Sequence, residues 1–126
     1  MLTIQDYIND KNLYVVDKTY QRPNNVWSRE DKQCLIDTIL KNEPIPIFFF
    51  NYIDAQGIYY VVDGQQRLNA IHEFYHNKIK LNRKFSGDDR HGQTFNGESP
   101  ISQSDKQKFL NYSLSVKIAY GLQKRA

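Results

Sequence analysis

The chain has 126 residues, of which 40% are hydrophobic and 25% charged, and it carries a net charge of +3. This composition is typical of an ordinary globular domain, and the length is enough to bury a core without disulfides or a structural metal. We therefore expect one domain over residues 1–126. No apolar run approaches the ~20 residues of a membrane helix, and no signal peptide is recognisable. A lone cysteine excludes an internal disulfide and fits a reducing cytoplasm.

The charge is unevenly distributed along the chain. Residues 1–77 contain seven Lys/Arg and ten Asp/Glu, a net charge of −3, whereas residues 78–126 contain ten and four, a net charge of +6. A basic region of this kind can form a nucleic-acid face. Lys-rich loops that are merely solvated explain it about equally well, so the charge alone does not choose between the two.

The first third of the chain contains two capped helices around a short strand. A capping box precedes residues 4–9, which we expect to be helical, and residues 13–16 favour a strand. The segment 18–25 is expected to be irregular, because a Pro and an Asn pair interrupt either period. A second capping signal begins a helix over about residues 29–41, which is amphipathic. Cys34 borders its apolar side, so we expect a buried, inert thiol rather than a nucleophile.

The middle third is expected to form a hairpin followed by a helix. Residues 45–51 and 58–62 have strong strand preference, and a turn at 54–57 joins them. The second strand passes through an Asp-Gly pair directly into an amphipathic helix over about residues 65–77.

The last third begins with a loop and ends on a strand. Residues 82–100 contain three of the six glycines and read as a long mobile loop. A capped helix is expected to run to about residue 112, followed by an alternating, half-buried strand over residues 114–120. Because no closing element follows this strand, we expect the chain to be either a piece of something longer or an unusually abbreviated member of its kind.

The strongest candidate site is the junction Asp63-Gly64-Gln65-Gln66-Arg67. A helix that starts here leaves backbone N–H groups that favour an anion. Gly64 permits a positive φ or a close approach, and the Arg67 fork suits phosphate. Asp63 could hold Arg67, a metal ion or water. The alternative is a polar turn in which Arg67 pairs with Asp63 for structural reasons alone. The pattern is not a Walker loop.

A second candidate is Tyr20-Gln21-Arg22, which stands before a proline and just after a predicted strand. Its Arg could face the same crevice as the first candidate and supply a second phosphate contact, and its Tyr could stack on a base. An ordinary exposed loop is the competing interpretation.

Residues 72–76 read His-Glu-Phe-Tyr-His, which matches the helical pattern of zinc proteases. Zinc needs both rings turned toward a cleft, together with a third ligand. At about 100° per residue, the apolar side of this helix centres near Ile71 and Tyr75, so that His72 and His76 turn toward solvent. No third ligand follows at a familiar spacing, and we interpret the match as accidental.

The two candidate motifs, taken with their surroundings, resemble a known family. The chain is similar to the N-terminal domain of GmrSD-type, modification-dependent restriction systems, within the ParB/sulfiredoxin-like superfamily. The residues that carry the resemblance are Tyr20-Gln21-Arg22, Trp27, residues 35–40 and 44–46, the turn at residues 63–67, and residues 108–116.

The resemblance implies a compact α+β fold, with a small mixed sheet and flanking helices, in which the two motifs meet at a nucleotide-binding crevice. Family members bind and often hydrolyse nucleoside triphosphates, and so control cleavage of modified DNA by an attached nuclease domain. In the sulfiredoxin branch a catalytic Cys precedes the Arg of the turn. Here Gln66 takes that place, which argues against sulfiredoxin chemistry. No nuclease domain is recognisable, so we expect the nuclease to lie elsewhere.

The resemblance also implies roles for particular residues. The nucleotide-binding residues would be Tyr20, Gln21, Arg22, Gly64, Gln65, Gln66 and Arg67. Hydrolysis would use Asp63 and Arg67, with Asp63 positioning water or the Mg²⁺ that accompanies a nucleoside triphosphate. The alternative is a ParB-like DNA-binding module without nucleotide turnover, and its contacts would be Lys78, Lys80, Arg83 and Lys84. A homo-oligomer is compatible with either function, and no membrane partner is expected.

Overall fold

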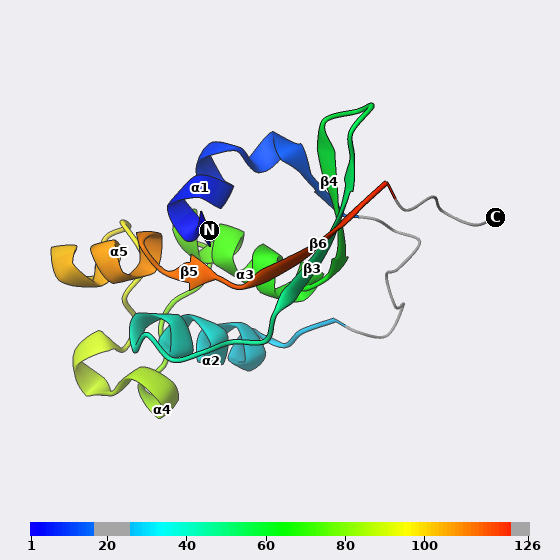
Figure 1. The fold of residues 1–126 in the computed structure, drawn as a ribbon. Helices are drawn as coiled ribbons and strands as arrows, with labels where there is room; N and C mark the ends of the chain where they lie inside the picture. The colour runs from blue at the N-terminus through cyan, green and yellow to red at the C-terminus, as the bar shows by residue number, and fades with distance from the viewer. Residues whose placement is uncertain (17–25, 122–126) are drawn as a thin grey trace.

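A computed structural model describes residues 1–16 and 26–121 of the chain (Figure 1). Its helices are α1 (Ile4–Asn9), α2 (Arg29–Leu40), α3 (Gln65–Tyr75), α4 (Arg83–Ser86) and α5 (Gln103–Leu110), with 3-10 turns η1 (Lys11–Leu13) and η3 (Asp88–Arg90). Its strands are β1 (Leu2–Thr3), β2 (Tyr14–Val16), β3 (Phe48–Ile53), β4 (Ile58–Asp63), β5 (Ser113–Leu114) and β6 (Val116–Tyr120). None of the helices in these ranges has the length and apolar character needed to cross a membrane.

The main sheet has four strands in the order β2-β4-β3-β6, and β1 pairs separately with β5. The β3–β4 hairpin is antiparallel, while β2 runs parallel to β4 and β6 runs parallel to β3. The carboxyl ends of β2 and β4 therefore lie at the same edge of the sheet as the amino ends of β3 and β6. The α+β class with a mixed sheet and flanking helices is confirmed.

The core lies between the helices and one face of this sheet. Alternation along β3 and β4 places Phe48, Phe50 and Val61 on the same face, where they are almost fully buried. The helices contribute stripes at helical spacing, of which Ile36 on α2 and Ile71 on α3 are fully buried. This packing sets the position of the β4–α3 junction, because both elements that flank the junction belong to the core.

Local capping explains where α1, α2 and α5 begin. Thr3 and Ser28 form reciprocal capping boxes at α1 and α2, and Ser102 accepts a hydrogen bond from Asp105 N at α5. Each cap satisfies backbone donors that a helix start would otherwise leave unpaired. The expected helices at these three places are confirmed.

Two expected strands differ in extent. The strand expected from residue 45 begins at Phe48, because Pro44 and Pro46 have no N–H to donate to a ladder. The strand expected over residues 114–120 is interrupted at Ser115, so that β5 pairs with β1 while β6 joins the main sheet.

The interpretation of residues 82–100 as a long loop was wrong in part. This segment contains α4 and η3, and Asn82 caps α4 by accepting a hydrogen bond from Lys84 N at 3.0 Å. Helices of four and three residues complete hardly more than one turn, so they leave no periodicity in the sequence.

The prediction that Cys34 is buried was also wrong. Its side chain is exposed on α2, whereas the next residue, Leu35, is buried. One position along a helix turns a side chain by about 100°, which is enough to move a residue from the border of a stripe into solvent.

Candidate functional site

The candidate site is the junction at which β4 leaves the sheet and α3 begins. Gly64 is the N-cap of α3 and has a left-handed conformation, with φ 104° and ψ 11°. It offers no side-chain cap, in contrast to α1, α2 and α5. The positive φ that the sequence suggested for Gly64 is present. The first turn of α3 therefore lacks the side-chain acceptor that the starts of the other four helices have.

Phe48 explains why residue 64 has to be glycine. A Cβ atom on residue 64 would lie 2.3 Å from Cδ1 and 2.9 Å from Cε1 of the Phe48 ring. Phe48 is fully buried in the core, so its ring cannot swing away. The sequence pointed to Gly64 but did not reveal this partner, because it lies on the neighbouring strand.

Arg67 is buried, with a side-chain exposure of 8%. Its guanidinium donates to the backbone carbonyls of Pro46 and Ile47, with Nη2 to Ile47 O at 3.3 Å, and lies 4.5 Å from the centre of the Phe48 ring. Burial lowers the pKa of the Arg67 guanidinium, and the nearby Asp63 carboxylate partly opposes this shift. These contacts hold the start of β3 against the first turn of α3.

Asp63 pairs with Arg67 at a longer distance. The separation from Asp63 Oδ2 to Arg67 Nη2 is 3.7 Å, and the Asp63 side chain is 74% exposed. The structural pairing that the sequence allowed is therefore present, but the closer contacts of the guanidinium are with the two carbonyls. The carboxylate of Asp63 remains largely accessible to a ligand from solvent.

The two glutamines anchor the turn on either side. Gln65 Nε2 donates to Val61 O at 3.1 Å, back onto β4. Gln66 Oε1 accepts a hydrogen bond from Trp27 N at 3.4 Å, which attaches the start of α3 to the chain just before α2. Both side chains are only half-buried, so parts of them are accessible at the surface of the junction.

The second motif, Tyr20, Gln21 and Arg22, lies outside the described residues, so its meeting with the turn stays a prediction. The described residues on each side of it are both near the junction. Val16 pairs in register with Val61 on β4, and Trp27 contacts Gln66 on α3.

The four basic residues of the DNA-binding alternative are all exposed. Lys78 and Lys80 follow α3, while Arg83 and Lys84 belong to α4. Arg83 lies 3.7 Å from Asp88, and Lys84 forms an ion pair with Glu30 at 3.0 Å. Within residues 1–16 and 26–121, Lys78 and Lys80 have no ion-pair partner.

His72 and His76 lie on α3 with their ring centres 4.4 Å apart, edge to face. Burial lowers the pKa of His72, and the positive charge of Lys11 acts in the same direction. Among the residues that the structure describes, no group of three His, Cys, Asp or Glu side chains could hold a metal ion.

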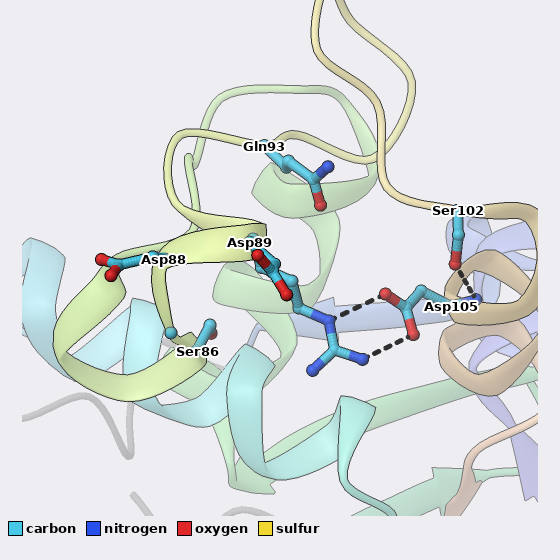
Figure 2. Close-up of a pocket in the computed structure, with 8 residues that line it drawn as sticks. Ser86, Asp88, Asp89, Gln93, Ser102 and Asp105 are labelled. Carbon is cyan, nitrogen blue, oxygen red and sulfur yellow. Dashed lines mark hydrogen bonds and ion pairs between the residues drawn. The ribbon is translucent and has the colours of Figure 1, made fainter.

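A separate pocket of about 570 Å³ lies between the α4–η3 segment and the start of α5 (Figure 2). Its wall is a bidentate pair in which Arg90 Nε and Nη2 each lie 2.9 Å from the carboxylate of Asp105, whose side chain is 8% exposed. The sequence interpretation missed this pair, because the two residues are fifteen positions apart with no shared periodicity. Its contacts hold the 83–93 segment against α5.

These observations define an α+β domain with a mixed sheet and a polar strand–turn–helix junction at one sheet edge. The family model described as "GmrSD restriction endonuclease, N-terminal domain" matches residues 4–123, and the chain belongs to this family. The family connects the chain with restriction systems and with a nuclease domain. A search of curated proteins and a search of solved structures each returned no match.

Proposed function

We propose that this domain binds a nucleoside triphosphate with Mg²⁺ and thereby regulates a nuclease of a modification-dependent restriction or antiphage defence system. The observation that carries the proposal is that Gly64, the N-cap of α3, provides no side chain to accept hydrogen bonds from the first backbone N–H groups of the helix. This helix start lies at the edge of a well-packed core. Backbone N–H groups at such a helix start can bind phosphate oxygens, and the helix dipole favours the negative charge.

The side chains around this helix start support the same ligand. Arg67 places a positive charge beneath the turn while its hydrogen bonds keep the turn in position. Asp63 is exposed beside it, and Mg²⁺ in such sites is usually held by one or two carboxylates together with the phosphates of the ligand. When bound, Mg²⁺ would neutralise charge on the phosphates. Tyr20, Gln21 and Arg22 would complete the site if the second motif faces this edge.

Thermal unfolding with a panel of nucleoside triphosphates and Mg²⁺ tests the proposal. At a ligand concentration about 100 times Kd, binding adds about 2.7 kcal/mol, which raises the Tm of a domain of this size by several degrees. The informative variant is Gln66→Glu, which keeps the shape of the side chain and its acceptor for Trp27 N but adds a negative charge next to the phosphates. Arg67→Ala is less informative, because it removes internal contacts as well.

The matched control is Asn69→Asp, which adds the same charge at an exposed position one turn further along α3. We expect the Tm increase to be lost in Gln66→Glu and kept in Asn69→Asp. If no nucleotide changes the Tm of the wild type, or if Gln66→Glu responds fully, the proposal is wrong.

Hydrolysis is a further step of the same proposal. Asp63 is the accessible carboxylate at the junction, so it is the group that would position Mg²⁺ or the attacking water. Release of inorganic phosphate from the nucleotide identified above should fall at least tenfold in Asp63→Asn. Equal rates in the two proteins would exclude this role for Asp63.

DNA binding is a second candidate function, favoured by the exposure of Lys78 and Lys80 and by their lack of ion-pair partners among the described residues. Fluorescence anisotropy with a labelled duplex over a range of salt concentrations tests it. If all four cations touch phosphates, the slope of log K against log salt should fall by about 0.9 for each one neutralised. The four sites to neutralise are Lys78, Lys80, Arg83 and Lys84, and Lys117→Gln serves as the control. An unchanged slope would rule out this surface.

A further inference from the structure

Four tyrosines form one continuous row across the main sheet, with one residue from each strand. Tyr14 on β2 pairs in register with Tyr59 on β4, Tyr59 pairs with Tyr52 on β3, and Tyr52 pairs with Tyr120 on β6. Residues paired in register point to the same face of a sheet. Their ring centres are 5.2, 4.6 and 6.0 Å apart along the row, so each ring contacts the next.

This tyrosine row lies at the end of the sheet remote from the candidate nucleotide site. Tyr59 is close to the start of β4, whereas Asp63 ends that strand. Figure 1 shows the β3–β4 hairpin projecting beyond the helices, so this end of the sheet extends past the helical layer. Tyr120 is 71% exposed, and the other three tyrosines are half-buried. The row is therefore accessible and is not needed in full by the core.

An apolar groove of about 290 Å³ continues from the row. Tyr14 and Tyr59 form one side of it, and its remaining lining is Met1, Leu2, Phe50, Leu114, Val116 and Ile118. Met1 is fully exposed at the rim. The groove is large enough for one aliphatic side chain, whereas the row itself presents aromatic faces and phenol groups.

The charges around the row favour a cation. Burial is the main cause that raises the pKa of Tyr14 to about 12, and the neighbouring Tyr59, Asp10 and Asp6 contribute in the same direction. Asp6 and Asp10 are both exposed and act on Tyr14, at one end of the row, although Asp6 also accepts the Thr3 N–H of the α1 capping box. The faces of tyrosine rings attract Lys and Arg, and nearby carboxylates strengthen this attraction while they repel a polyanion.

We propose that the tyrosine row and its groove bind a basic, extended segment of a partner protein. An Arg or Lys side chain stacks on the rings, and a neighbouring apolar side chain enters the groove. Tyr52 and Tyr120 meet at an interplanar angle of 72°, so their faces point in different directions, and a planar guanidinium stacks on the face of the more exposed ring, Tyr120. The proposal is independent of nucleotide binding.

A fluorescein-labelled hexapeptide with one Leu between two Arg residues is a suitable probe. Its partner probe replaces both Arg residues with citrulline, which has the same shape but no charge. Fluorescence anisotropy with the whole chain should show tighter binding of the Arg peptide. Tyr120→Leu should weaken that binding about two- to fivefold, in line with one cation–π contact at an exposed site.

Two variants show whether the aromatic face is responsible. Tyr120→Phe keeps the ring and should bind the Arg peptide like the wild type. Lys117→Gln changes the opposite face of β6 and should also leave binding unaltered. Because Tyr120 is mostly exposed, none of these variants removes a core side chain.

Three results would overturn the proposal. The first is equal affinity for the Arg and citrulline peptides, which would remove the cation from the recognition. The second is that a labelled oligothymidylate binds more tightly than the Arg peptide and loses this binding in Tyr120→Leu. That result would mean that the row stacks on nucleic-acid bases. The third is a dimer in sedimentation that Tyr120→Leu dissociates, which would mean that a second copy covers the row.

Discussion

The ring of Phe48 occupies the space that a side chain on residue 64 would need, with Cδ1 only 2.3 Å from where a Cβ would stand. The same ring lies against the guanidinium of Arg67, 4.5 Å from its centre. One buried aromatic residue of β3 thus positions both the glycine and the arginine of the junction, although neither is on its strand.

The first prediction concerns Gly64→Ala. The substitution forces a side chain into the left-handed region and against a buried ring, and we expect it to lower the free energy of unfolding by about 2–4 kcal/mol. Gly57 provides the control, because it also has a positive φ, of 65°, but nothing lies within 4 Å of its missing Cβ. Urea denaturation of both variants separates the contact with Phe48 from the backbone strain. Equal losses at the two sites would show that Phe48 contributes nothing.

A double-mutant cycle gives the second prediction. Phe48→Val removes the Cδ1 and Cε1 atoms that approach residue 64. Gly64→Ala should therefore cost at least about 1 kcal/mol less in this background than in the wild type, which is a typical coupling for residues in contact. The measurement is again urea denaturation of the wild type, the two single variants and the double variant. Strict additivity would contradict the close approach.

The third prediction concerns the internal contacts of Arg67. Arg67→Met keeps much of the apolar side chain but leaves the carbonyls of Pro46 and Ile47 without their donor, and we expect a loss of about 2 kcal/mol. Arg29→Met is the control, because Arg29 is exposed at the first position of α2. Chemical denaturation should separate the two variants clearly. If both are equally stable, the hydrogen bonds to the start of β3 carry little energy.

The fourth prediction concerns the ion pair between Arg90 of η3 and Asp105 of α5. Asp105→Asn removes the charge from a buried bidentate pair with Arg90, so we expect a loss of about 2–3 kcal/mol and faster hydrogen exchange at the backbone amides of α4 and η3. Asp89 lines the same pocket but is exposed. Asp89→Asn should therefore change neither the free energy of unfolding nor the rate of hydrogen exchange. Unchanged exchange in Asp105→Asn would mean that other contacts order this segment.

The fifth prediction is a loss of stability in alkali. Burial is the main cause that raises the pKa of Tyr7, and of Tyr14, from the ordinary value of 10 to about 12. The folded state therefore binds these two protons more tightly than the unfolded state does. The resulting stability is complete below pH 10 and is lost as the pH rises through 12.

Urea denaturation at several pH values and phenolate absorbance both measure this effect. Tyr7→Phe should make the fall in the free energy of unfolding between pH 10 and 12 shallower. Tyr120→Phe, at an exposed ring, should leave the fall unchanged. A fall of the same size in all three proteins would refute the assignment to buried phenols.

Features that depend on neighbours in sequence could be predicted well. The capping boxes at Thr3 and Ser28 require only residues three positions apart, and the Asp-Gly pair after a strand is enough to suggest the start of α3. The family resemblance rests on several short motifs spread along the chain, and the match over residues 4–123 confirms it.

Features that depend on distant partners could not be predicted. The motif around Arg67 predicts a phosphate ligand. In the structure the Arg67 guanidinium instead donates to backbone carbonyls that are twenty and twenty-one residues earlier in the chain. The burial of Arg67 follows from how β3 packs beside α3, for which the sequence contains no periodic signal. The exposure of Cys34 could not be predicted either, because successive residues of a helix are rotated by about 100°, and one such step separates a core position from a solvent-exposed one.

The amino-acid sequence alone is enough to recognise the family, because its motifs can be read at their positions along the chain. It also identifies a glycine turn between a strand and a helix, because that turn depends on residues adjacent in the chain. Which side chains surround that turn follows only from the packed fold. Strand register aligns Tyr14 with Tyr59 and Tyr52 with Tyr120, and core packing brings Phe48 to Gly64. Register and packing involve residues that are between 16 and 68 positions apart in the chain, so they arise only when the whole sheet and its helices assemble.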